Sequence, residues 1–64
     1  MSEKDAMYWI LLRERKPPQL ADFRRKFGWK KGTGLIHELA LKGCITIDNK
    51  SRVIPTKNHE RCLR

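Results

Sequence analysis

Two histidines and two cysteines are the residues of this sequence with the most versatile side-chain chemistry. They are His37, Cys44, His59 and Cys62. His59 and Cys62 form one close pair, but His37 and Cys44 lie seven residues apart across an expected helix end, which fits no common zinc pattern. A nucleophilic cysteine would also need an oriented third group and an oxyanion pocket, for which the sequence offers no candidate. We therefore expect no metal, no cofactor and no enzymatic activity.

The cysteine count also bears on redox state. Cys44 and Cys62 could form one disulfide, but a lone pair without a secretion signal is more typical of reduced thiols. We interpret Cys44 as a small buried hydrophobic residue at the start of a strand. His59 and Cys62 are interpreted as parts of a solvated tail, so the sequence predicts two free thiols.

The basic residues offer a second kind of chemistry, the binding of a polyanion. The chain has 15 Lys and Arg against 7 Asp and Glu, a net charge of +8 on 64 residues. Residues 13–31 carry +6 and residues 50–64 carry +4, whereas residues 1–12 and 32–49 each carry −1. Two basic clusters separated by a nearly neutral apolar segment are expected where two elements bind one polyanion. The pattern favours nucleic-acid contact over a role in solubility alone.

The elements that position these residues must fit into one small domain. A chain of 64 residues buries only about 60% of its unfolded surface, which leaves room for one thin core and no deep effector pocket. The longest apolar stretch, Ala6 to Leu12, is far shorter than the ~20 residues that span a bilayer, and no signal peptide is recognisable. We expect a cytoplasmic, nucleoid-associated protein with one domain over residues 1–56 and a basic C-terminal tail over residues 57–64.

A first helix is expected to begin at Ser2 and to run to about Arg15. Ser2 and Asp5 have the spacing of a capping box, and the prolines at 17 and 18 must end the helix because they exclude helical geometry just before them. Its core stripe comprises Met7, Ile10 and Leu11. Tyr8, Trp9 and Leu12 fall outside that stripe. The helix is therefore either covered on several sides within the domain or carries a surface for a homodimer or a protein partner.

Two further helices are expected. Pro18 suits the first position of the second helix and Gly28 suits its end, since proline lacks the N–H that is unsatisfied there and glycine tolerates the left-handed cap. The buried stripe of this helix comprises Leu20, Phe23 and Phe27. The third helix covers about residues 30–43. Its expected core face carries Trp29, Gly32, Ile36, Leu39, Ala40 and Gly43, and its other side carries Lys30, Thr33, Gly34 and His37.

From Cys44 onward the pattern alternates as in β-strands. Residues 44–48 and 52–54 are separated by turn residues and predict a hairpin. A two-residue loop would pair Ile47 with Arg52, whereas a three-residue loop would pair Ile47 with Val53 and Asp48 with Arg52. We favour the three-residue loop because it places the apolar residues on one face and lets opposite charges meet.

The order of helix, proline break, helix, glycine turn, helix and hairpin resembles the winged helix-turn-helix family of DNA-binding domains. The resemblance is carried by Pro18-Gln19-Leu20-Ala21-Asp22-Phe23, by Phe27-Gly28-Trp29, and by Ile36-His37-Glu38-Leu39-Ala40-Leu41-Lys42-Gly43-Cys44-Ile45. It covers about residues 5–56. It implies an α+β fold, a winged helix-turn-helix of three helices followed by a two-stranded β-hairpin wing.

The resemblance also implies a binding mode on double-stranded DNA. The third helix would enter the major groove, with Lys30, Lys31, Thr33 and His37 near phosphates and base edges. The wing, about residues 44–55, would place Lys50 and Arg52 at the backbone or an adjacent minor groove. Arg24, Arg25 and Lys26 on the second helix would mostly meet phosphate.

These observations lead to two hypotheses of different classes. The first is a small bacterial or phage DNA-binding protein, a transcriptional regulator or, within the same class, an excisionase-like architectural factor that bends DNA. The second is a winged-helix module for protein interaction that uses Tyr8, Trp9 and Leu12. Since few side chains can read bases, the first hypothesis favours a homodimer or a protein partner for useful specificity.

Overall fold

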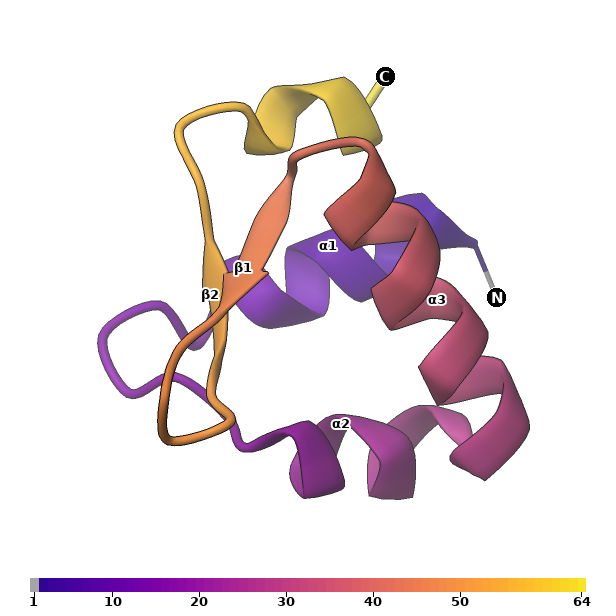
Figure 1. Cartoon of the computed structure of the whole chain (residues 1–64). Helices are drawn as coiled ribbons and strands as arrows, with labels where there is room; N and C mark the ends of the chain where they lie inside the picture. Colours follow the sequence, from indigo (N-terminus) through magenta and orange to yellow (C-terminus); the bar gives the residue numbers. More distant parts are fainter. Residues whose placement is uncertain (1) are drawn as a thin grey trace.

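A computed structural model describes residues 2–64 and shows an α+β fold consistent with a winged helix. Within these residues its elements are α1 (Glu3–Leu11), α2 (Leu20–Phe27), α3 (Trp29–Leu41), β1 (Ile45–Ile47), β2 (Val53–Pro55) and the 3₁₀ helix η1 (His59–Cys62). Figure 1 shows α2 and α3 meeting at a corner, the hairpin lying opposite that corner, and α1 crossing behind. The expected three helices followed by a two-stranded hairpin are confirmed.

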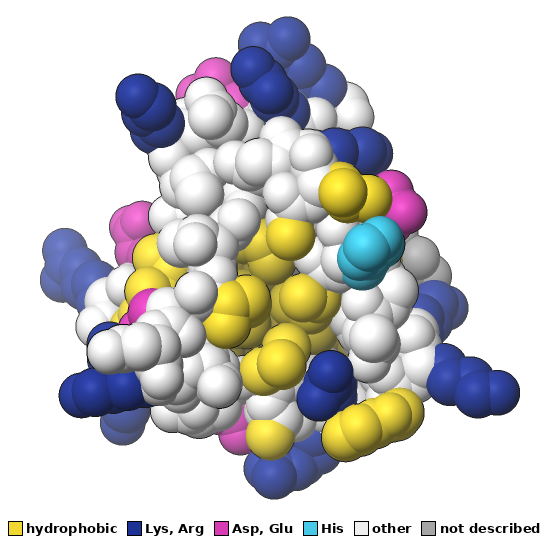
Figure 2. All heavy atoms as spheres, in the orientation of Figure 1, with side chains coloured by type: hydrophobic (Ala, Val, Ile, Leu, Met, Phe, Trp, Pro, Cys, Tyr) yellow, Lys and Arg dark blue, Asp and Glu magenta, His cyan; other side chains and the backbone are white. Residues whose placement is uncertain are grey.

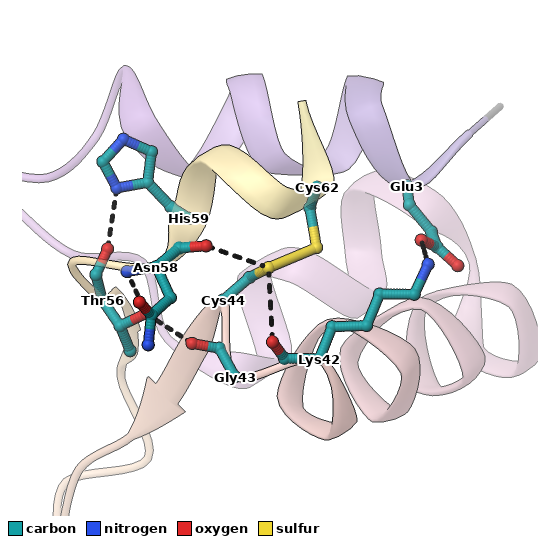
Figure 3. The surroundings of a disulfide bond; sticks show 8 residues. All are labelled: Glu3, Lys42, Gly43, Cys44, Thr56, Asn58, His59 and Cys62. Atoms are coloured by element: carbon teal, nitrogen blue, oxygen red, sulfur yellow. Dashed lines mark hydrogen bonds and ion pairs between the residues drawn. A yellow bond between two sulfur atoms is a disulfide. The ribbon is translucent and has the colours of Figure 1, made fainter. Parts of the chain in front are cut away.

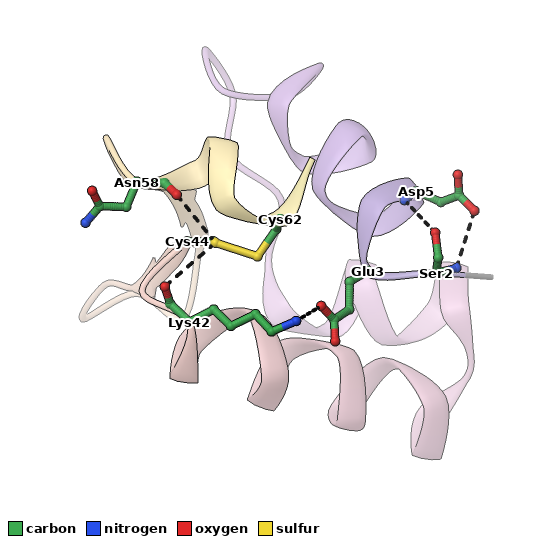
Figure 4. Close-up of polar contacts among 7 residues, drawn as sticks. All are labelled: Ser2, Glu3, Asp5, Lys42, Cys44, Asn58 and Cys62. Carbon is green, nitrogen blue, oxygen red and sulfur yellow. Dashed lines mark hydrogen bonds and ion pairs between the residues drawn. A yellow bond between two sulfur atoms is a disulfide. The ribbon is translucent and has the colours of Figure 1, made fainter. Parts of the chain in front are cut away.

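Helix α1 begins where its capping box predicts. The Asp5 N–H donates to Ser2 Oγ and the Ser2 N–H donates to Asp5 Oδ2, each over 3.3 Å, so two unpaired backbone donors are satisfied (Figure 4). The helix ends at Leu11, earlier than the predicted Arg15. Residues 12–16 continue as turns, in which the Arg13 N–H donates to the Ile10 carbonyl over 3.0 Å. These tighter turns redirect the chain ahead of the two prolines.

The segment between α1 and α2 pairs with the hairpin. The prediction that Pro18 occupies the first turn of α2 is wrong, because Pro18 precedes the helix and its carbonyl accepts from the Val53 N–H over 2.9 Å. Gln19 forms an antiparallel bridge with Arg52, and α2 begins one residue later at Leu20. The dihedral angle that proline imposes also suits extended chain, and here the extended Gln19 after it pairs along the free edge of the hairpin.

The hairpin has the predicted three-residue connection. Ile47 pairs with Val53 and Ile45 with Pro55, and the Asp48 N–H donates to the Arg52 carbonyl over 3.2 Å. Ile45 and Val53 are buried, whereas Ile47 near the tip is 37% exposed. Ser51 adopts a left-handed φ of 59°, which closes the loop in the register that leaves Asp48 opposite Arg52.

The core lies where α1, α2, α3 and the hairpin meet. Its fully buried large side chains are Phe23, Met7, Ile10, Leu39, Val53 and Cys44. Trp9 packs edge-on against Phe23 and Phe27, with ring centroids 5.6 and 5.7 Å apart. The half-buried Trp9 therefore belongs to the packing of the domain, which is the first of the two alternatives left open for α1.

The C-terminal segment is attached to the core, and two predictions for it are wrong. Cys44 and Cys62 are joined in a disulfide with Cα atoms 6.5 Å apart, so they are not free thiols (Figure 3). Cys62 is 4% exposed and does not lie in a solvated tail. The chain returns after β2 because the Thr56 N–H donates to the Cys44 carbonyl over 2.9 Å, and η1 then packs on α1. A second link, between Lys42 Nζ and Glu3 Oε2, ties the end of α3 to the start of α1 (Figure 4).

Candidate nucleic-acid interface

Gly28 alone separates α2 from α3. Its φ is 94° and its N–H donates to the Arg24 carbonyl over 2.8 Å, which confirms its predicted role at the end of α2. Four residues on, the absence of a side chain at Gly32 lets the two helices approach, since an added Cβ there would lie 3.1 Å from Arg24 Cα. This corner brings the basic end of α2 against the basic start of α3.

Trp29 lies on the outside of this corner, although the sequence places it in the core. It is 70% exposed, and Ala40, also predicted on the core face, is exposed as well. The core face of α3 instead carries Gly32, Leu35, Ile36 and Leu39. The one-residue turn fixes the rotation of α3 about its axis, and at this rotation Trp29 and Ala40 lie beside the buried face.

A chain of contacts holds the corner together. The Arg24 guanidinium lies over the Trp29 ring, 4.4 Å from its centroid, and Arg24 Nε donates to Thr33 Oγ1 over 3.1 Å. The Thr33 hydroxyl in turn donates to the Trp29 carbonyl over 2.7 Å. Arg24, Trp29 and Thr33 are therefore held relative to one another. Arg24 and Thr33 belong to the residues predicted to contact DNA.

The remaining basic residues of the corner point into solvent. Lys26, Lys30 and Lys31 are exposed, and within residues 2–64 no carboxylate lies within 4.0 Å of their ammonium groups. Arg25 is also exposed but forms a 3.5 Å ion pair with Asp22. His37 is exposed further along α3. The corner therefore presents at least three cations that no described acidic group neutralises.

The hairpin tip is less cationic than its sequence suggests. Arg52 Nε lies 2.7 Å from Asp48 Oδ2, so its charge is largely offset, and Lys50 remains exposed at the turn. The Arg52 N–H donates to Asp48 Oδ1 over 2.8 Å, and this bond is the main cause that lowers the pKa of the Asp48 carboxyl below its ordinary value of 3.8. The Arg52 side chain and the Lys50 N–H lower the same pKa further, against an opposing effect of desolvation.

The Asp48 interactions predict an acid-sensitive hairpin. A carboxyl with a lowered folded-state pKa stabilises the fold fully above its unfolded pKa of about 3.9, and that stabilisation is lost as the pH falls through the folded value. We expect Asp48→Asn to reduce the dependence of the free energy of unfolding on pH in this range. The Asn amide oxygen can still accept from the Arg52 and Lys50 N–H groups, but the side chain has no carboxyl group to titrate. Urea unfolding between pH 2 and pH 6 measures the effect, and parallel profiles for both proteins would contradict it.

Gly34 lies on the exposed side of α3, and its replacement tests which side of the helix packs against α2. Nothing lies within 4 Å of a Cβ added there, and the residue sits in the interior of the helix. Gly34→Ala is therefore expected to raise the free energy of unfolding by about 1 kcal/mol, through better helix propensity. Gly32→Ala is the matched control, because its Cβ meets the Arg24 backbone. Urea unfolding should show a clearly smaller gain for Gly32→Ala, and equal gains would contradict this packing of the corner.

The predicted partner surface on α1 is divided by the structure. Tyr8 and Leu12 are 49% and 83% exposed, whereas Trp9 packs against the two phenylalanines. Beside Leu12 lies a shallow concavity with a largely apolar floor, lined by Trp9, Leu11, Leu12, Pro17 and Pro18 and edged by charged residues of the loop 13–16. Leu41 at the end of α3 is also exposed, by 69%. The sequence does not mark it as a surface residue, because it follows Ala40, which is predicted to lie in the core.

One face of the molecule combines apolar and basic character. Figure 2 shows hydrophobic side chains gathered in the middle of the face bounded by α2, α3 and the hairpin, with Lys and Arg side chains around its edges.

Comparison of the chain with known protein families, curated proteins and solved structures finds no match. Within residues 2–64 no three His, Cys, Asp or Glu side chains are placed to hold a metal ion, and no helix is both long and apolar enough to cross a bilayer.

Proposed function

We propose that this chain is a small protein that binds double-stranded DNA, acting as a transcriptional regulator. In this proposal α3 enters the major groove and the hairpin β1–β2 contacts the backbone or an adjacent minor groove. The observation that carries the proposal is the α2–α3 corner, where Lys26, Lys30 and Lys31 are exposed and face no described carboxylate. Exposed cations on a rigid helix corner suit a regularly spaced row of phosphates.

The division of charge between corner and wing refines the expected contacts. Arg24 is held by Thr33 and Trp29 through its Nε and its flat face, which leaves its terminal amino groups available for phosphate or base edges. Arg52 is paired with Asp48, so Lys50 supplies the main charge of the wing. We therefore expect most of the binding free energy from the corner and a smaller share from the hairpin.

Titration of a random-sequence duplex of about 20–30 base pairs tests the proposal. Binding should weaken steeply between about 50 mM and about 200 mM salt, with a log–log slope near −0.9 for each phosphate neutralised. An absence of binding at the lower salt concentration would exclude the proposal. A bend in the bound duplex, measured by energy transfer between its ends, would favour the excisionase-like architectural role over simple regulation.

A protein-interaction module is the second candidate function. It is favoured by the hydrophobic side chains in the middle of the face in Figure 2 and by the exposed Tyr8 on α1 and Leu12 at its C-terminal cap. Sedimentation equilibrium separates the two uses of α1. A dimer that dissociates in the Leu12→Lys variant would assign this helix to self-association, whereas a monomer at all concentrations would leave α1 free for another protein.

The cytoplasm, at the nucleoid, is the compartment we propose for a DNA-binding role. Thiol reductants there act against disulfides, and structural disulfides are rare in such proteins. The Cys44–Cys62 bond would have to persist through burial, and the two residues are 0% and 4% exposed. Thiol alkylation of the protein in intact cells reports directly which form is present.

A further inference from the structure

Trp29 is the largest exposed aromatic side chain at the basic corner, and none of the DNA contacts proposed above involves its indole ring. A 70% exposed indole is unusual beside a well-buried hydrophobic core, and Trp29 lies between Lys26 and Lys30 in the sequence. The Arg24 guanidinium holds the indole from one ring face, while the Thr33 hydroxyl bonds to Arg24 and to the Trp29 backbone carbonyl. A large, fixed and exposed aromatic residue is typical of a contact that becomes buried on binding.

The Arg24 guanidinium decides what kind of contact Trp29 can make. It covers one face of the indole ring, 4.4 Å from the centroid, and leaves the other face and the outer edge open. A side chain that intercalates between base pairs needs both ring faces free. Trp29 held in this way cannot intercalate, and it offers one apolar face to a single partner group.

In a duplex, the base faces are stacked and out of reach, so only groups at the base edges remain. The one apolar group that a base pair presents in the major groove is the C5 methyl of thymine. Resting on the DNA-binding proposal, we propose that Trp29 is a specificity-determining residue whose open face packs on a thymine methyl in the major groove.

The same geometry gives Arg24 a paired role. With Nε bound to Thr33 and its flat face on Trp29, the planar guanidinium is held in one orientation, and its two terminal amino groups have no ion-pair partner among the described residues, so they remain available to the DNA. These donors suit a phosphate or the O6 and N7 acceptors of a guanine next to the thymine. Trp29 and Arg24 therefore act as one unit, with Thr33 as the positioning residue.

The test compares two duplexes of about 20–30 base pairs with alternating adenine and thymine, one of them carrying deoxyuridine in place of every thymidine. The two differ in the C5 methyl groups, and the base-pairing groups and the minor-groove edge are the same. The protein is expected to bind the thymine duplex about fourfold more tightly, the gain for burying one methyl group. Fluorescence anisotropy at low salt measures both affinities.

Variants separate this inference from the DNA-binding proposal itself. Trp29→Ala should bind both duplexes equally while keeping the salt dependence of the native chain. Leu41→Ala, which removes an exposed apolar side chain from the far end of α3, is the control and should keep the fourfold ratio. Equal binding of both duplexes by the native chain would overturn the inference with no need for a variant. An absence of binding to either duplex would instead exclude the proposed function.

Single strands provide the remaining outcome. A ring with one open face could also stack on an unpaired base. If the native chain binds oligothymidine more tightly than the thymine duplex, and Trp29→Ala removes that preference, base stacking replaces methyl contact and the inference is overturned. We expect the duplex to bind more tightly, because Lys26, Lys30 and Lys31 can then meet phosphates on a rigid backbone.

Discussion

Replacing Lys26, Lys30 and Lys31 together with alanine is expected to weaken binding to duplex DNA on the order of a thousandfold at about 50 mM salt. The reason is electrostatic. Each phosphate neutralised contributes about 0.9 to the log–log salt slope, so three lost contacts lower the slope by about 2.7. All three side chains are exposed, and their removal leaves the core untouched. Anisotropy titrations across a salt series measure the slope and the affinity together.

The control for this variant removes the same charge elsewhere. Lys4, Arg15 and Lys16 are also exposed, and they lie on α1 and its following loop rather than at the α2–α3 corner. Their joint replacement with alanine lowers the net charge by the same three units and should weaken binding by less than about tenfold. If both triple variants lose affinity equally, binding responds to net charge alone and the corner has no special role.

The features that the sequence predicts correctly depend on neighbours a few residues apart. Ser2 and Asp5 cap α1, and Asp48 meets Arg52 across a three-residue connection. Both were readable because a capping box and a hairpin register depend on fixed short spacings and on complementary groups. The placement of basic residues on α2, on the start of α3 and on the hairpin follows from the same local patterns.

Features set by tertiary geometry could not be read in this way. The rotation of α3 depends on the dihedral angles of Gly28, and those expose Trp29 where periodicity placed it inside. The pairing of Pro18 and Gln19 with the hairpin depends on an edge strand that lies more than thirty residues later in the chain. The disulfide depends on the return of residues 56–62 across α1. That the exposed cations bind DNA stays a prediction, because the charge and geometry are compatible with binding but do not measure it.

The second large effect concerns the disulfide. Reduction of the Cys44–Cys62 bond is expected to lower the free energy of unfolding by about 3 kcal/mol, because the bond closes a loop with a sequence separation of 18 residues and restricts the unfolded chain. A domain of this size has a total of roughly 3–10 kcal/mol, so this loss is a large share of its stability. Urea unfolding of the native chain with and without a phosphine reductant measures the difference.

Cys62→Ala provides the control for the effect of the reductant. Without a partner thiol at position 62, its unfolding midpoint should not respond to the reductant and should lie near that of the reduced native chain. A small further loss is expected from the missing sulfur, since Cys62 is 4% exposed in the core. Unchanged midpoints for the native chain with and without reductant would contradict the bond or its contribution.

The reduced chain is nevertheless expected to keep its fold and its basic corner at low temperature. The Cys44 N–H donates to the Leu39 carbonyl over 3.0 Å, and the Thr56 N–H donates to the Cys44 carbonyl, so the junction of α3 and β1 has its own backbone bonds. A reduced Cys44 thiol also has the Asn58 carbonyl as an acceptor 3.5 Å away (Figure 3), whereas a disulfide sulfur has no proton to donate. Duplex affinity at low temperature should therefore change little on reduction. A large loss would mean that the attached tail, with Arg61 and Arg64, takes part in binding, and would move the DNA contacts away from the corner alone.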